Sequence, residues 1–230
     1  MAKQLSSQGP VYKHIVNMHT ISYYFVVATL LISTLLVFAC WLFGWAIWLV
    51  ALLVMLAWMP LVWKVMNTIF QKYQWLALLF VIVVAQGAHT IEHTAQMVQL
   101  HILGLHGAQA SGFIGALNIE WVHLIWNTWV LVMAPILLYF FRKNPWLWIL
   151  FVFAIYHEIE HIYMVAVYVK TGIAGTPGLL AKGGVIGGGL PIVRPDLHFL
   201  YALFEEGLLL IAYYAEIKKR LLPQPKASIV

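Results

Sequence analysis

Two copies of the short motif HxxEH place ionisable side chains inside otherwise apolar sequence. The motifs, HTIEH and HEIEH, are formed by His89, Glu92 and His93 and by His157, Glu160 and His161. On an α-helix, positions i, i+3 and i+4 lie on one face, so each motif directs two imidazoles and one carboxylate to the same side. Ionisable groups are costly inside a membrane unless a partner compensates them. The groups of both motifs could satisfy one another in a hydrogen-bonded network or bind a ligand, and the joint spacing of the histidines favours a ligand.

Two further segments carry histidine and glutamate at helical spacing. Glu120 and His123 are three residues apart in EWVH, and His198 and Glu205 are seven residues apart in HFLYALFE. With a rise of ~1.5 Å per residue, all four segments reach a similar depth along their predicted helices. We therefore expect four helices to bring these side chains together in the outer half of the bilayer.

The residue types favour a transition-metal site. Histidine and carboxylate ligands without sulfur suit iron, copper or zinc, and the single cysteine, Cys40, excludes a thiolate cluster, an internal disulfide and a CxxC redox pair. The predicted ligands are His89, His93, Glu120, His123, His157, Glu160, His161, His198 and Glu205. This set exceeds the three protein ligands of a typical catalytic zinc site, so we predict two ions in a dinuclear centre.

Glu92 and Glu160 are also candidate catalytic residues. Each carboxylate could ligate a metal, orient a neighbouring imidazole or act as a general base. The HxxEH order occurs in soluble inverzincins, and soluble di-iron proteins place ExxH and Glu on facing helices. Membrane fatty-acid hydroxylases and desaturases also hold metals with helical histidines, but their HxxHH spacing is missing from this sequence. These likenesses concern chemistry and architecture only.

The elements that must position these residues are membrane-spanning helices. The 230-residue chain is 63% hydrophobic and only 9% charged, and its mean hydropathy is +0.88, which is typical of membrane proteins. A helix needs ~20 apolar residues to cross a bilayer. Such stretches lie at 20–43, 45–67, 73–101, 119–141, 146–169 and 197–217. We predict an all-α bundle of six transmembrane helices, the last four of which form a metal-binding four-helix core.

We predict one integral membrane domain over residues 1–230. A polar segment at 1–19 precedes the first span, a glycine-rich loop at 170–196 joins the last two spans, and a basic tail occupies 218–230. If the spans alternate, ten Lys and Arg residues lie on one side and three on the other. The positive-inside rule then places both termini on the cytoplasmic side of the plasma or cytoplasmic membrane. The glycine-rich loop should lack regular structure and act as a linker or a gate.

The leading functional prediction is a membrane oxidoreductase acting on a lipid-soluble substrate, because burial among apolar helices protects reactive intermediates from water. The sequence shows no haem-attachment or flavin motif, so a quinol or a partner protein would have to supply electrons. The alternatives are a zinc-dependent hydrolase of a lipid amide or ester, a transition-metal transporter and a b-haem protein. Basic residues spread over short loops without an aromatic-basic face exclude nucleic acid as a partner.

Overall fold

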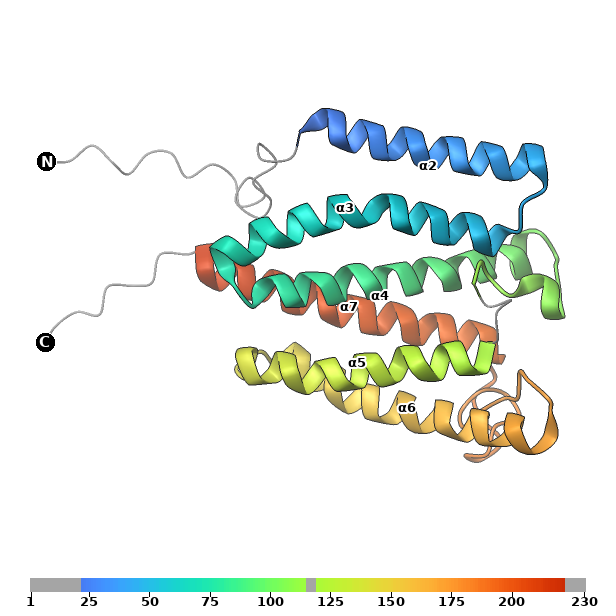
Figure 1. The fold of residues 1–230 in the computed structure, drawn as a ribbon. Helices are drawn as coiled ribbons and strands as arrows, with labels where there is room; N and C mark the ends of the chain where they lie inside the picture. The colour runs from blue at the N-terminus through green and yellow to red at the C-terminus, as the bar shows by residue number, and fades with distance from the viewer. Residues whose placement is uncertain (1–21, 115–118, 222–230) are drawn as a thin grey trace, which may run out of the picture.

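The computed structural model describes residues 22–114 and 119–221, and the regular structure in these ranges is helical. The six long helices are α2 (Tyr23–Phe43), α3 (Ile47–Tyr73), α4 (Leu76–Met97), α5 (Ile119–Phe141), α6 (Pro145–Thr171) and α7 (Arg194–Leu221) (Figure 1). All six are long and apolar enough to cross a membrane. The predicted all-α bundle of six spans is therefore confirmed, while the polar segment 1–19 and most of the basic tail lie outside the described residues.

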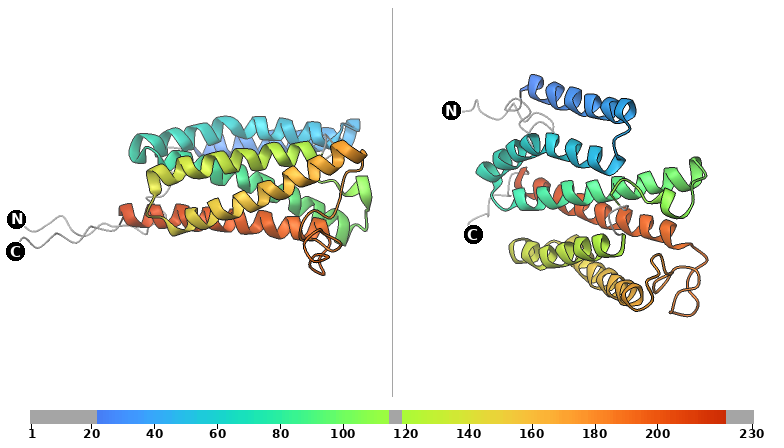
Figure 2. Two further views of the ribbon diagram at one scale, coloured as in Figure 1. Left: turned by 90° about the horizontal axis from the view of Figure 1, so that it is seen from below. Right: turned by 45° about the vertical axis from the view of Figure 1, so that its right-hand side comes forward.

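Helices α4 to α7 form a four-helix core, and the hairpin of α2 and α3 lies at its side (Figures 1 and 2). Within the core, α4 packs mainly against α7 and α5 packs mainly against α6. Outside it, α3 contacts α4 and α2 contacts α3. Helix α2 begins and α7 ends at the same end of the bundle, as an even number of spans requires. The side of the membrane on which this end lies stays a prediction.

Local sequence determines several helix ends. Gly44 follows α2 in a left-handed conformation with a φ of 64°, which glycine adopts without steric cost. This turn produces the predicted hairpin between the first two spans. At the start of α6, the Asn144 side chain accepts a hydrogen bond from the Trp146 backbone N–H, and Pro145 occupies the first helical position.

The core helices have an apolar half and a polar half. The half near the end of α7 contains the main cluster of buried apolar side chains, among them Leu79, Leu137, Leu147 and Leu209. The other half, toward segments 103–114 and 172–193, contains the six histidines of helices α4 to α7. We call this second half the loop half. The histidines of the core helices are thus confined to one half of the bundle.

Segments 103–114 and 172–193 cover the end of the loop half. The first includes the 3₁₀-helix Gly107–Ala110. The second consists of turns that are held together by backbone hydrogen bonds, such as the 2.8 Å bond from the Lys182 N–H to the Ile192 carbonyl oxygen. The glycine-rich segment therefore has a defined path across the end of the core without forming a helix or a regular strand.

Candidate metal centre

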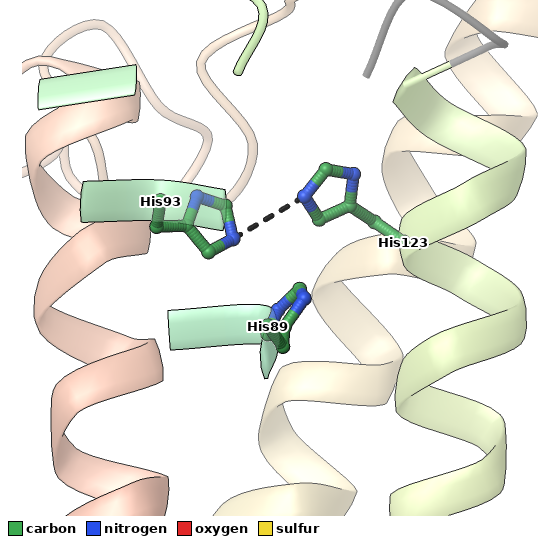
Figure 3. Close-up of side chains that lie close together, drawn as sticks. All are labelled: His89, His93 and His123. Atoms are coloured by element: carbon green, nitrogen blue, oxygen red, sulfur yellow. Dashed lines mark hydrogen bonds between the residues drawn. The ribbon is translucent and has the colours of Figure 1, made fainter. Parts of the chain in front are cut away.

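Six histidines from the four core helices meet inside the loop half, where their exposed fractions lie between 0 and 7%. They form two triads: the α4/α5 triad of His89, His93 and His123, and the α6/α7 triad of His157, His161 and His198. Within each triad, one ligand nitrogen from every residue lies within 4.8 Å of the others. Figure 3 shows the rings of the α4/α5 triad pointing into one common space.

Nitrogen spacing within the triads fits shared metal coordination. His93 Nε2 lies 3.3 Å from His123 Nε2, and His157 Nε2 lies 3.1 Å from His161 Nε2. Two nitrogens bound tetrahedrally to one ion at ~2.0–2.1 Å lie about 3.3 Å apart. Each of these pairs could therefore bind one ion with little movement of the rings.

Several imidazoles present a buried nitrogen that lacks a hydrogen-bond partner among the described residues. These atoms are Nε2 of His89, Nδ1 of His161 and Nε2 of His198. An unsatisfied buried polar group costs about 1–3 kcal/mol. Nitrogen donors of this kind suit zinc, copper, iron and nickel, so the donor set fits a transition metal.

The two triads lie side by side and form one cluster. Ring centroids are 5.1 Å apart for His93 and His198, and 5.6 Å apart for His123 and His161. These two contacts are equivalent if His93 corresponds to His161 and His123 corresponds to His198. The rings of His123 and His198 themselves lie 5.1 Å apart. The cluster thus has an approximate twofold axis between these two rings, which exchanges α4 with α6 and α5 with α7.

The sequence repeats in the same order as this symmetry. HTIEH on α4 is followed on α5 by HLIW, which ends at Trp126, and HEIEH on α6 is followed on α7 by HFLY, which ends at Tyr201. The Trp126 ring lies 5.2 Å from that of His89, and the Tyr201 ring lies 5.1 Å from that of His157. Each triad is therefore built by one helical hairpin of the same design.

The glutamates of the two HxxEH motifs contact the segments that cover the loop half. Glu92 Oε1 accepts a 2.7 Å hydrogen bond from the Ile114 backbone N–H. Glu160 Oε1 accepts hydrogen bonds from the backbone N–H groups of Leu179, at 2.9 Å, and Leu180, at 3.4 Å. In each hairpin, the helical turn that carries two histidines thus also holds the segment that follows its helix.

Two left-handed glycines permit this close approach of backbone to carboxylate. Gly112, with a φ of 77°, lies against Glu92, and Gly178, with a φ of 72°, lies against Glu160. A Cβ atom at Gly178 would lie 2.6 Å from Glu160 Oε1.

We expect Gly178→Ala to lower the free energy of unfolding by about 1–3 kcal/mol, because it adds a steric clash to the strain of a positive φ. Gly188→Ala is the matched control, since Gly188 has a φ of 82° but a Cβ there meets nothing within 4 Å. Thermal unfolding in detergent would compare the two variants. Equal losses would show that the contact with Glu160 does not matter.

Glu120 lies in a buried ion pair that joins three parts of the chain. Its two carboxylate oxygens accept hydrogen bonds from Arg194 Nη1 at 2.9 Å and Arg194 Nη2 at 3.0 Å. The Gly175 backbone N–H also donates to Oε1 at 2.8 Å. The pair therefore links the beginnings of α5 and α7 to segment 172–193.

Glu205 contacts a histidine directly. Its Oε1 lies 2.9 Å from His157 Nδ1, and its Oε2 accepts a 2.9 Å hydrogen bond from Gln86 Nε2. Because a carboxylate accepts hydrogen bonds, His157 Nδ1 is the donor and His157 Nε2 keeps the lone pair that a metal needs. Similarly, His93 Nδ1 lies 3.3 Å from the Gln96 side-chain oxygen.

Comparisons with known proteins give no relative for this chain. No protein-family model matches it, and no match was found among curated proteins or solved structures. Its function therefore has to be inferred from the chemistry of the site.

The structure brings together all six histidines that the sequence predicts as ligands. The predicted carboxylate ligands Glu120, Glu160 and Glu205 are each hydrogen-bonded to other protein groups, so a direct bond to metal stays a prediction for them. Sequence reasoning missed Gln86 and Gln96. A signal for both was present, because they lie three residues before His89 and three after His93, on the histidine face of an apolar helix.

Proposed function

We propose that this protein is an integral membrane metalloenzyme that holds one transition-metal ion in each histidine triad and acts as an oxidoreductase on a lipid-soluble substrate. The observation that carries the proposal is the pair of three-histidine sites, related by the approximate twofold axis, inside apolar helices. Two such ions would supply redox chemistry when bound. The surrounding helices would exclude water from the reaction.

The ligand set favours copper. Carboxylate ligands are typical of di-iron sites in helical bundles, but here the nearby carboxylates contact Arg194, His157 and loop N–H groups. What is left at each site is three imidazoles. Copper stands at the top of the affinity order of divalent first-row metals at such nitrogen sites, so we propose copper in both triads.

Aromatic side chains between the lipid-facing surface and the α6/α7 triad support a quinol as the substrate or reductant. Phe204 is 45% exposed on α7, and its ring lies 4.9 Å from that of Phe153. The Phe153 ring lies 5.3 Å from that of Tyr201, which contacts His157. A flat, apolar ring could pack against these side chains from the bilayer.

The alternative functions have less support. A zinc hydrolase needs a general base, whereas Glu92 and Glu160 both accept hydrogen bonds from covering segments. A transporter needs a polar route across the membrane, but the main cluster of buried apolar side chains lies in the other half of the core. A haem would have to fit between its two axial histidines, whereas every imidazole of this cluster contacts at least two others.

Elemental analysis tests the proposal directly. Protein expressed with added copper, purified in detergent and freed of loosely bound ions should contain about two copper ions per chain. An absorption spectrum of the same sample should lack a haem Soret band. Less than one tightly bound ion per chain, or zinc in preference to copper under competition, would overturn the copper oxidoreductase.

A further inference from the structure

One of the places where the approximate twofold symmetry of the two triads breaks down is the buried carboxylate of Glu205. Glu205 lies seven residues after His198, the α7 member of its triad. The equivalent position, seven residues after His123, is Val130, which is 1% exposed. One triad is therefore adjoined by a carboxylate where the other is adjoined by an apolar side chain.

The hydrogen-bond partner of this carboxylate is asymmetric as well. Gln86 of α4 donates to Glu205 and also accepts a 3.0 Å hydrogen bond from Trp126 Nε1. By the twofold relation, the counterpart of Gln86 on α6 is Ala154, which has no polar side chain and is buried. The hydrogen-bonded pair of Gln86 and Glu205 therefore has no polar equivalent, because Ala154 and Val130 occupy the corresponding positions.

The first histidines of the two motifs consequently have different surroundings. His157 and Glu205 are both fully buried, and His157 Nδ1 lies 2.9 Å from the Glu205 carboxylate. The corresponding residue, His89, stacks on the Trp126 ring at an interplanar angle of 15°. Its Nε2 has no hydrogen-bond partner in the described part of the chain.

A carboxylate that accepts the N–H of a ligating imidazole strengthens that ligand. It fixes the tautomer and the ring orientation, and it makes the imidazole a better electron donor. The Glu205 carboxylate contacts Gln86 and His157, and neither of these side chains carries a fixed positive charge. A bound cation would compensate this buried negative charge, as Arg194 compensates Glu120.

We infer that the two metal sites are unequal, with the α6/α7 triad holding its ion ~10- to 100-fold more tightly than the α4/α5 triad, the range by which partners of ligating histidines change affinity. This inference rests on the proposed binding of one ion in each triad. It makes the α6/α7 ion the resident one and the α4/α5 ion the more readily exchanged. Glu205 is the positioning residue that creates the difference.

Two variants that each keep a single intact triad test the inference. His123→Ala leaves the α6/α7 triad complete, and His198→Ala leaves the α4/α5 triad complete. Each purified full-length variant is titrated with Cu(II) against a chromogenic Cu(II) chelator in detergent. We expect the dissociation constant of His198→Ala to exceed that of His123→Ala by ~10- to 100-fold. Equal constants, or tighter binding by His198→Ala, would overturn the inference.

Adding Glu205→Gln to both variants assigns the difference to its cause. In the His123→Ala protein this change should weaken copper binding by ~10- to 100-fold, and in the His198→Ala protein it should change binding less than threefold. Equal shifts in both proteins would show that Glu205 acts through general stability and would refute the role assigned to it. If Glu205→Gln does not fold, the comparison of the single-histidine variants still decides. Wild-type protein that binds no copper would instead refute the proposed function itself.

Discussion

Replacing His157 with alanine should reduce the metal content of the protein from about two ions per chain to about one. The α6/α7 triad would keep only two imidazoles, and Glu205 would lose the hydrogen-bond donor that it contacts in the wild-type protein. Loss of a ligand should weaken metal binding by more than the ~10- to 100-fold caused by changing a residue that only hydrogen-bonds to a ligand. Elemental analysis and thermal unfolding of the same preparation would measure metal content and stability separately.

Two controls accompany this variant. His101→Ala removes a histidine that lies outside both triads and whose side chain is 57% exposed, so it should keep both ions. Glu158→Gln changes the residue next to His157, but Glu158 Oε1 accepts its hydrogen bond from Thr128 of α5. It should also keep both ions. A His157→Ala protein with lowered stability but unchanged metal content would mean that His157 belongs to a hydrogen-bonded network and ligates no metal.

The second large effect is expected at Arg194. Arg194→Ala should lower the free energy of unfolding by about 3–5 kcal/mol, because it leaves the Glu120 carboxylate buried without a compensating charge. Glu120 is 1% exposed, and it holds the beginnings of α5 and α7 together through this pair. Unfolding by heat or denaturant in detergent would measure the loss.

The double variant Arg194→Ala with Glu120→Gln isolates the ion pair, because it removes the uncompensated charge. It should be more stable than Arg194→Ala alone. Asp196→Asn is the surface control at the same end of α7, since Asp196 pairs with the exposed His101 and such pairs contribute only ~0–1 kcal/mol. A double variant that is less stable than Arg194→Ala would contradict this account of the pair.

The sequence predicts the membrane bundle and the histidine cluster because both depend on local patterns. Apolar stretches of sufficient length place α5 at residues 119–141, the bounds that the structure shows. Helical periodicity alone puts His89 with His93 and His157 with His161 on common faces. Because the four His/Glu segments lie at a similar depth along their helices, these faces are predicted to meet, and the two triads confirm this.

The partners of the carboxylates could not be predicted in this way. Helical spacing gives the face on which a side chain lies, but it does not say which of several nearby groups the side chain contacts. Arg194 is 74 residues from Glu120 and precedes an apolar stretch. Its sequence context is that of an ordinary charged loop residue, so its pairing with Glu120 could not be predicted. Likewise, the backbone N–H groups that Glu92 and Glu160 bind have no signature in side-chain sequence. The ligand role that spacing predicts for Glu160 stays a prediction, and the contacts of Glu92 and Glu160 with the covering segments are known from the structure alone.

The packing of the two hairpins has a consequence for the order of assembly during biogenesis. Helices α4 and α5 supply one triad, yet each packs mainly against a helix of the other hairpin. The first hairpin inserted would therefore expose His89, His93 and His123 without the neighbours that hold them in place. In the two-stage description of membrane-protein folding, helices insert before they associate. Both triads would then form in the second stage, after α7 enters the bilayer, and metal incorporation would follow translation instead of accompanying it.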